Sequence, residues 1–218
     1  MTAPPGRVLP RSFYERAAQQ VARDLLGKSL LHRVAWGVRV ARIVETEAYL
    51  GLEDPASHAF RGPTPRSALM FGVPAHLYVY FTYGMHHCAN VVTEVDGVAG
   101  AVLLRAAAVE EGLACVASRR GAGVAEAALL RGPGNLCRGL GLSRADNGID
   151  LLEPSSRVRI EASTVHPPIA VSTRIGLRQA ADRPLRFTWV GDPAVSRPAP
   201  RIATMPMPAA RGKRKGPD

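Results

Sequence analysis

Segments that are typical of β-strands recur along the chain, and they constrain its fold more than any other feature of the sequence. Each is a short apolar or alternating run bounded by glycine, proline or other turn residues. They lie at 29–34, 37–49, 77–81, 88–95, within 98–109, at 157–163 and at 185–191. The segment 145–153 is expected to run from a turn into another strand. The runs 77–81 and 88–95 are expected to be the two arms of a β-hairpin, with residues 82–85 near its tip.

Helical patterns are fewer. The segment 12–27 carries an apolar stripe at helical spacing, with Ser12 and Glu15 as a capping box and Gly27 as a stop. Short helices are expected at 110–119, 123–131 and 134–140. The stretch 50–76 is rich in glycine and proline, and so long a loop inside a compact domain often carries function.

The charge of the chain is unusual. There are 28 Lys and Arg against 18 Asp and Glu, a formal net charge of +10 in 218 residues. This balance favours a partner rich in phosphate, although a basic protein whose charge only keeps it soluble is the alternative. The three cysteines are scattered without a CxxC motif, so they indicate neither a disulfide framework nor a four-cysteine metal site.

The two ends of the chain differ from its middle. Residues 1–10 are expected to form a flexible arm, 11–195 one folded domain, and 196–218 a basic disordered tail that either adds nonspecific affinity for nucleic acid or is passive. The start has no apolar core of signal-peptide length, and no run approaches ~18 apolar residues. The protein is therefore expected to be soluble and intracellular, in the cytoplasm or nucleoid of a prokaryote or the nucleus of a eukaryote.

Aromatic residues concentrate in one window. Of the twelve Phe, Tyr and Trp residues, seven lie between positions 49 and 83, where core packing can account for the phenylalanines. Tyr83 is different because it belongs to the expected hairpin tip, which is usually exposed. An exposed aromatic at a tip of a basic protein suits a wedge between base pairs. The alternative is a tyrosine that folds back onto its own loop.

Carboxylates and histidines lie beside these aromatics. In the stretch RIVETEAYLG, Glu45, Glu47 and Tyr49 alternate in a strand, so they are expected to share a face unless a bulge intervenes. A carboxylate beside aromatic faces suits a reaction that develops positive charge on a flat substrate, where it can also deprotonate a water. The run 86–88, His-His-Cys, is a poor chelate because adjacent strand residues point to opposite faces, and no metal or other cofactor is expected.

Three long motifs of the sequence together indicate a protein family. They are RIVETEAYLGLEDPASHAFRGPTPRSALMF, LYVYFTYGMHHCANVV and VLLRA, with weaker matches at 25–31, 132–142 and 183–187. With these residues the chain closely resembles the alkyladenine (3-methyladenine) DNA glycosylase family over most of 12–195. The resemblance implies an α+β fold: a single mixed domain with a curved, mainly antiparallel β-sheet flanked by helices and a protruding hairpin that intercalates into DNA. It also implies excision of damaged purines from duplex DNA by hydrolysis of the N-glycosidic bond.

The resemblance assigns roles in the catalytic step and in the hairpin. Glu47 is implied as the general base that activates the attacking water, and Arg105 as an arginine near that water and the phosphate of the target nucleotide. Tyr83 corresponds to the residue that fills the gap left by the flipped nucleotide, and Met85 is expected against the neighbouring bases. Glu45 corresponds to no catalytic residue of the family, so it is still expected to be a solvent-facing strand residue.

The resemblance also implies a pocket for the flipped base. Tyr49 and Tyr80 are the expected aromatic walls, His58 the third wall, and Asn90 the pocket-floor residue that helps to exclude guanine. Two departures affect the DNA-facing side: the loop between His58 and Thr64 is one residue shorter than in the animal enzymes, and His86 stands where those enzymes have an aromatic residue.

Cutting of the DNA strand by a glycosylase usually requires an amine nucleophile. Outside the tail only Lys28 is available, at the end of the helix expected over 12–27. A monofunctional enzyme that uses water and leaves an abasic site is therefore expected. The resemblance implies double-stranded DNA with damaged purines as its partner, and the enzyme is expected to be a monomer. A noncatalytic binder of damaged or distorted DNA is the alternative, and a nucleotide- or RNA-processing hydrolase ranks last because neither a P-loop nor a metal-binding constellation is recognisable.

Overall fold

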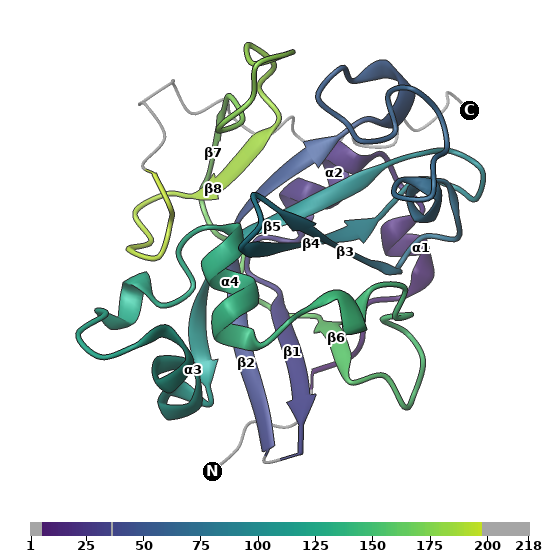
Figure 1. Ribbon diagram of the computed structural model, residues 1–218. Helices are drawn as coiled ribbons and strands as arrows, with labels where there is room; N and C mark the ends of the chain where they lie inside the picture. Colours follow the sequence, from purple (N-terminus) through teal and green to yellow (C-terminus); the bar gives the residue numbers. More distant parts are fainter. Residues whose placement is uncertain (1–5, 36, 198–218) are drawn as a thin grey trace, which may run out of the picture.

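Eight strands form one curled sheet in the computed structural model, which describes residues 6–35 and 37–197 (Figure 1). Every pair of neighbouring strands is antiparallel, and the main order is β3-β4-β5-β2-β1-β6. The strands are β1 (Ser29–Val34), β2 (Gly37–Tyr49), β3 (Leu77–Thr82), β4 (His86–Val92), β5 (Ala101–Glu111), β6 (Val158–Glu161), β7 (Ile169–Ser172) and β8 (Arg186–Trp189).

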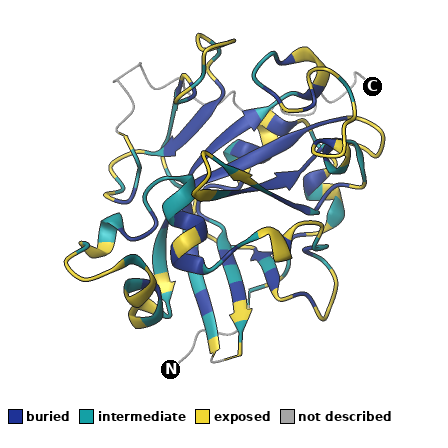
Figure 2. Cartoon of the chain, in the orientation of Figure 1, coloured by how far each residue is buried: buried dark blue, intermediate teal, exposed yellow. Residues whose placement is uncertain are grey.

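The sheet branches at β2. The first half of β2 pairs with β1, residues 45–47 pair with β8, and β5 follows the opposite edge over 40–49. Because β8 also pairs with β7, the second half of β2 lies between β5 and a two-stranded extension. Figure 2 shows the middle of the sheet buried, and residues 43–48 of β2 are all buried. Polar residues in this stretch therefore lie inside the protein.

In the described parts of the chain, four short α-helices and four 3₁₀ turns accompany the sheet. Helix α2 packs against β2 and β5, whereas α4 packs against β4 and β5. The α-helices are α1 (Arg11–Tyr14), α2 (Ala18–Asp24), α3 (Leu113–Arg120) and α4 (Pro133–Leu140), and the 3₁₀ turns are η1 (Gly51–Glu53), η2 (Ala68–Phe71), η3 (Glu126–Ala128) and η4 (Arg144–Asp146). The expected single mixed α+β domain with a curved, mainly antiparallel sheet is confirmed. No helix in the described parts of the chain is long and apolar enough to cross a membrane.

The prediction of a single helix over 12–27 is wrong. The chain forms α1 and α2, separated by Ala17 in a non-helical conformation, and the Ser12–Glu15 capping box does not form. The amide of Ala18 instead donates a 2.7 Å hydrogen bond to the carboxylate of Glu94, which follows β4. The first amides of a helix lack intrahelical hydrogen-bond partners, and a nearby capping side chain usually supplies one. At the start of α2 a residue from a distant part of the chain supplies it instead.

Other segments also differ from expectation. Strand β7 had no counterpart among the expected strands, and the helix expected over 123–131 is reduced to η3. The segment 145–153 contains only the end of η4 and one isolated bridge, between Asp150 and His76. Within the expected flexible arm, Ala162 donates its amide hydrogen to the carbonyl of Arg7, and Leu9 is buried. Of the expected tail, residues 198–218 lie outside the described residues.

Candidate active site

Glu45 and Glu47 are buried in the second half of β2, and neither side chain has any exposed surface. The pairing of β2 with β5 is irregular on both sides of Glu45. Even so, both carboxylates contact Arg105 of β5: Oε1 of Glu45 accepts from Nε at 2.8 Å, and Oε1 of Glu47 lies 3.1 Å from Nη1. The expectation that Glu45 faces solvent is wrong, because β8 and residue Ser196 cover that side of β2.

Three donors hold the carboxylate of Glu47. Oε1 receives Arg105 and the backbone amide of Ile175, the latter at 2.8 Å, and Oε2 receives the hydroxyl of Tyr49 at 3.0 Å. An ionised carboxylate can accept about four hydrogen bonds, two on each oxygen. Oε2 therefore retains the capacity to accept one more donor.

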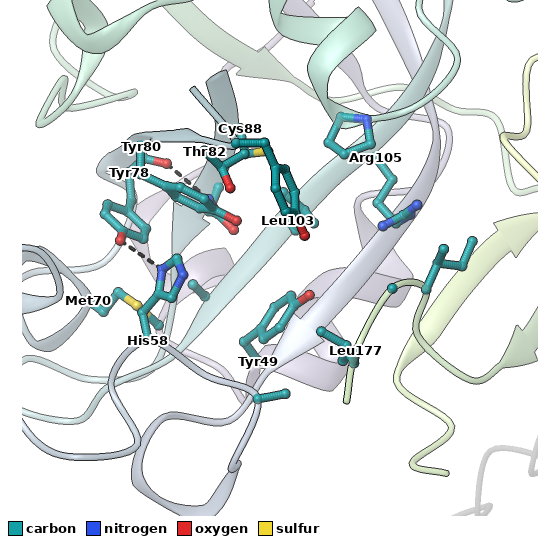
Figure 3. A pocket seen from close by; sticks show the side chains of 17 residues that line it. Tyr49, His58, Met70, Tyr78, Tyr80, Thr82, Cys88, Leu103, Arg105 and Leu177 are labelled. Carbon is teal, nitrogen blue, oxygen red and sulfur yellow. Dashed lines mark hydrogen bonds between the residues drawn. The ribbon is translucent and has the colours of Figure 1, made fainter. Parts of the chain in front are cut away.

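A cavity of about 350 Å³ opens beside this cluster (Figure 3). Its size suits a small flat molecule. Among the residues expected at the site, those that line the cavity are Tyr49, His58, Tyr80, Tyr83, Asn90 and Arg105. Glu47 and Met85 are not part of the lining. Glu47 instead adjoins the cavity through two lining residues that it contacts, Tyr49 and Arg105.

Aromatic rings gather on one side of the cavity, opposite Tyr49 and Arg105 (Figure 3). The ring centroids of His58 and Tyr80 lie 4.5 Å apart in an edge-to-face arrangement, and Nδ1 of His58 is 3.0 Å from the hydroxyl of Tyr78. The partial burial of the ring, together with the positive charge of Arg66, lowers the pKa of His58 to about 4. The imidazole is therefore neutral at pH 7, so it adds no positive charge to the cavity.

A guanidinium lies over each of the two tyrosines that were expected as walls. The Cζ atom of Arg66 is 5.0 Å from the ring centroid of Tyr80, and that of Arg174 is 4.7 Å from the ring centroid of Tyr49. Neither arginine lines the cavity. Guanidinium groups at these distances attract the ring faces, so they help to fix the orientation of both rings.

Arg174 is also the centre of a buried connection. It forms a two-contact ion pair with Asp54 and donates to the carbonyl of Ala48 at 3.0 Å. Asp54 accepts the amides of Leu50 and Ala56, so the pair fixes the loop that leads to His58. The residue after Arg174 donates to Glu47. The ion pair thus connects two loops to the end of β2: the loop that leads to His58 and the loop that contains Arg174.

The strands β3 and β4 pair from Leu77↔Val91 to Thr82↔His86, and residues 82–85 turn the chain between them. The amide of Met85 donates to the carbonyl of Thr82, and both Tyr83 (φ 51°) and Gly84 (φ 66°) have positive φ. Positive φ suits glycine but is unfavourable for tyrosine. The Tyr83 side chain is 84% exposed and Met85 is 70% exposed. Tyr83 does not fold back into the protein, and it lies at the mouth of the cavity.

Several site residues were not identified from the sequence. Tyr78 lies two residues before Tyr80, and strand alternation alone places both on one face. The segment 175–177 also lines the cavity, although it lies far along the sequence from the other lining residues. No local sequence pattern indicates that it belongs to a site. Among the described residues, no three His, Cys, Asp or Glu side chains are grouped so that they could hold a metal ion.

Comparisons with known proteins identify the family of the chain. The model of the methylpurine-DNA glycosylase family matches residues 12–193. A Mycobacterium tuberculosis (strain H37Rv) protein named "Putative 3-methyladenine DNA glycosylase" is 49% identical over 180 residues, which cover 80% of this chain and 86% of that protein. A Burkholderia orbicola protein of the same name is 44% identical over 200 residues, covering 91% and 95%. The chain therefore belongs to the methylpurine-DNA glycosylase family, a family of hydrolases that act on N-glycosyl bonds.

Proposed function

We propose that the protein is a monofunctional DNA glycosylase that flips damaged purines out of duplex DNA and hydrolyses their N-glycosidic bond with an activated water. The observation that carries the proposal is the contact of Glu47 with Tyr49 and Arg105, two residues that line an aromatic cavity of about 350 Å³. Family membership and the names of the relatives support the reaction class.

Recognition begins at the duplex. A base inside the stack is inaccessible, and its extrusion costs a few kcal/mol. In the proposal Tyr83 enters the stack beside the lesion and Met85 contacts the neighbouring bases. The exposure of both side chains supports this role. The net charge of +10 supplies attraction to the phosphates that does not depend on sequence.

The flipped base is proposed to stack between Tyr49 and Tyr80, with His58 as a third wall and Asn90 at the floor. Each aromatic face contributes about 1–3 kcal/mol by stacking. An alkylated purine that carries positive charge gains additional attraction to the ring faces. The amide nitrogen of Asn90 donates to the backbone carbonyl of Tyr78 at 3.1 Å, which fixes the orientation of the side chain. Ordinary purines are excluded by steric conflict with the floor.

The chemical step uses one water. Glu47 accepts a proton from this water at Oε2, the oxygen that has the free acceptor capacity, while Arg105 helps to hold the water. The water oxygen forms a bond to C1′ of the deoxyribose as the bond from C1′ to the purine nitrogen breaks, and the electron pair of that bond leaves with the base. The negative charge of Glu47 stabilises the positive charge that develops on the sugar.

The absence of a suitable amine supports the monofunctional reaction. Lys28 is the only lysine among the described residues; it donates to the carbonyl of Ser163 at 3.1 Å and does not line the cavity. A Schiff-base nucleophile is therefore not available there within the described chain. The product is proposed to be an intact abasic site. The enzyme is further proposed to act as a monomer, in the compartment that holds the genome.

A second candidate is a noncatalytic binder of damaged DNA. The complete burial of Glu47 favours it, because a carboxylate without exposed surface also suits a structural partner of Arg105. The Glu47→Gln variant separates the two functions. Duplexes containing hypoxanthine or an alkylated adenine are incubated with either protein, and half of each sample is then treated with alkali to cleave abasic sites.

The glycosylase proposal expects alkali-dependent cleavage with the wild type and a loss of at least about a hundredfold in the variant, a typical effect of removing a general base. Excision by the variant at the wild-type rate excludes the assigned role of Glu47. Binding without excision by the wild type on every lesion establishes the binder. Strand cleavage without alkali, at the rate of base release, excludes the monofunctional reaction.

A further inference from the structure

Glu45 accepts four hydrogen bonds in the interior of the protein. Its Oε1 accepts from Nε of Arg105 at 2.8 Å, from Nε of Arg186 at 2.7 Å and from Oγ of Ser196 at 2.8 Å. Its Oε2 accepts from the amide of Ser196 at 2.6 Å. Burial opposes the charge, but Arg105 and Arg186 outweigh it and lower the pKa of Glu45. The side chain is therefore a fully buried carboxylate that is ionised at neutral pH.

The guanidinium of Arg105 is shared between two carboxylates. Its Nε contacts Glu45, and its Nη1 contacts Glu47. Contacts through two different nitrogens fix the plane of a guanidinium, because the group is flat and its N–H directions are rigid. A contact with Glu47 alone would leave Arg105 free to rotate about that contact. The position of Arg105 at the cavity wall therefore depends on Glu45.

Charge balance points to the same arrangement. The side chain of Arg186 donates to Glu45 and to the hydroxyl of Ser172, and Arg186 does not line the cavity. The two carboxylates and two guanidiniums of this cluster compensate each other. Glu45 and Arg186 thus form the outer half of the cluster, and Glu47 and Arg105 form the half that reaches the cavity.

We propose that Glu45 is a positioning residue, which holds the guanidinium of Arg105 in the orientation that the excision reaction requires, and that Ser196 anchors Glu45 from the end of the described chain. The proposal rests on the function proposed above, since it assumes that Arg105 acts in the reaction. Glu45 itself touches neither the cavity nor the reacting atoms. The competing explanation is a structural ion-pair cluster whose loss only destabilises the fold.

A double-mutant cycle separates the two explanations. The variants are Glu45→Gln, Arg105→Gln and the double variant, and the readout is the single-turnover excision rate with enzyme in saturating excess over a hypoxanthine duplex. Under these conditions DNA affinity does not enter the rate. If Glu45 acts through Arg105, each single variant is slower by at least about tenfold, and the double variant is no more than about threefold slower than the slower single.

The matched control is Asp146→Asn. Asp146 is also a buried carboxylate held by arginine, with Nε of Arg157 at 2.8 Å, and it does not line the cavity. This variant is expected to lower the melting temperature while the excision rate stays within about twofold of the wild type. If Glu45→Gln does not fold, Glu45→Asp replaces it in the cycle, since aspartate keeps the charge but withdraws it from Arg105 by one methylene.

Two results overturn the proposal: a Glu45 variant that excises within about twofold of the wild type, or rate losses of the single variants that multiply in the double variant. In either case the proposed function survives if the wild type excises the base and Glu47→Gln does not. If the wild type excises no lesion, the proposed function itself fails. The two failures are therefore distinguishable in the same experiment.

Discussion

The hydroxyl of Tyr49 donates a 3.0 Å hydrogen bond to Oε2 of Glu47, two residues earlier on β2. The ring of Tyr49 lines the cavity, whereas the carboxylate of Glu47 lies outside the lining. In the proposed function, one side chain thus provides both a face for the flipped base and a donor to the general base. These two contributions can be separated by substitution.

Tyr49→Phe keeps the ring and removes the donor. We expect the free energy of unfolding to fall by about 1–3 kcal/mol, because a buried carboxylate loses a hydrogen bond. The affinity for lesion-containing duplex should be retained, whereas Tyr49→Ala should lose about 1–3 kcal/mol of stacking. Chemical denaturation and fluorescence anisotropy measure the two quantities. Tyr14→Phe is the control, because the buried hydroxyl of Tyr14 has no hydrogen-bond partner among the described residues.

The pair of Asp54 and Arg174 should be a major source of stability near the site. Both side chains are completely buried, so Asp54→Asn leaves an uncompensated guanidinium in the interior. We expect a loss of about 3–5 kcal/mol in urea unfolding. The exposed pair of Asp24 and Arg16 is the control, and Asp24→Asn should cost less than about 1 kcal/mol. Equal losses for the two variants would contradict the assignment.

His58 should give the stability a pH dependence in mildly acidic solution. Its pKa is about 4 in the folded protein, below the ordinary value of 6.5 for a histidine side chain. The unfolded chain therefore binds more protons between these values, and stability should fall as the pH decreases from about 6.5 toward 4. His58 is an exposed residue, so water screens the effect and the change should be modest. His58→Gln should flatten the dependence of the melting temperature on pH in this window, and an unchanged slope would contradict the assignment.

Much of the sheet could be predicted because its strands carry local signals. The expected strands at 29–34 and 37–49 coincide with β1 and β2. The helix expected over 12–27 failed because its break depends on a carboxylate from residue 94. A capping partner so far along the chain leaves no pattern in the local sequence.

Contacts between residues far apart in the sequence also limited the prediction of the candidate site. The alternation of Glu45, Glu47 and Tyr49 indicated one shared face, and Glu45 and Glu47 indeed meet on one side of β2, at Arg105. Burial of Glu45 could not be predicted, since its partners Arg186 and Ser196 lie far along the chain. A pair of carboxylates in a strand is solvent-facing unless other segments cover it, and that cover is a property of the tertiary fold.

The backbone at Tyr83 offers a test that separates stability from function. The residue has a φ of 51°, a conformation that costs most side chains about 1–2 kcal/mol but costs glycine almost nothing. Tyr83→Gly should therefore be at least as stable as the wild type in thermal unfolding, and more stable than Tyr83→Ala. Both variants lack the ring, so both should excise a lesion from fully paired duplex at least about tenfold more slowly under subsaturating enzyme. The defect should shrink when the lesion is mismatched, because extrusion then costs less. Wild-type excision from paired duplex by Tyr83→Gly would show that the ring is not a wedge and that its exposure at the turn has another cause.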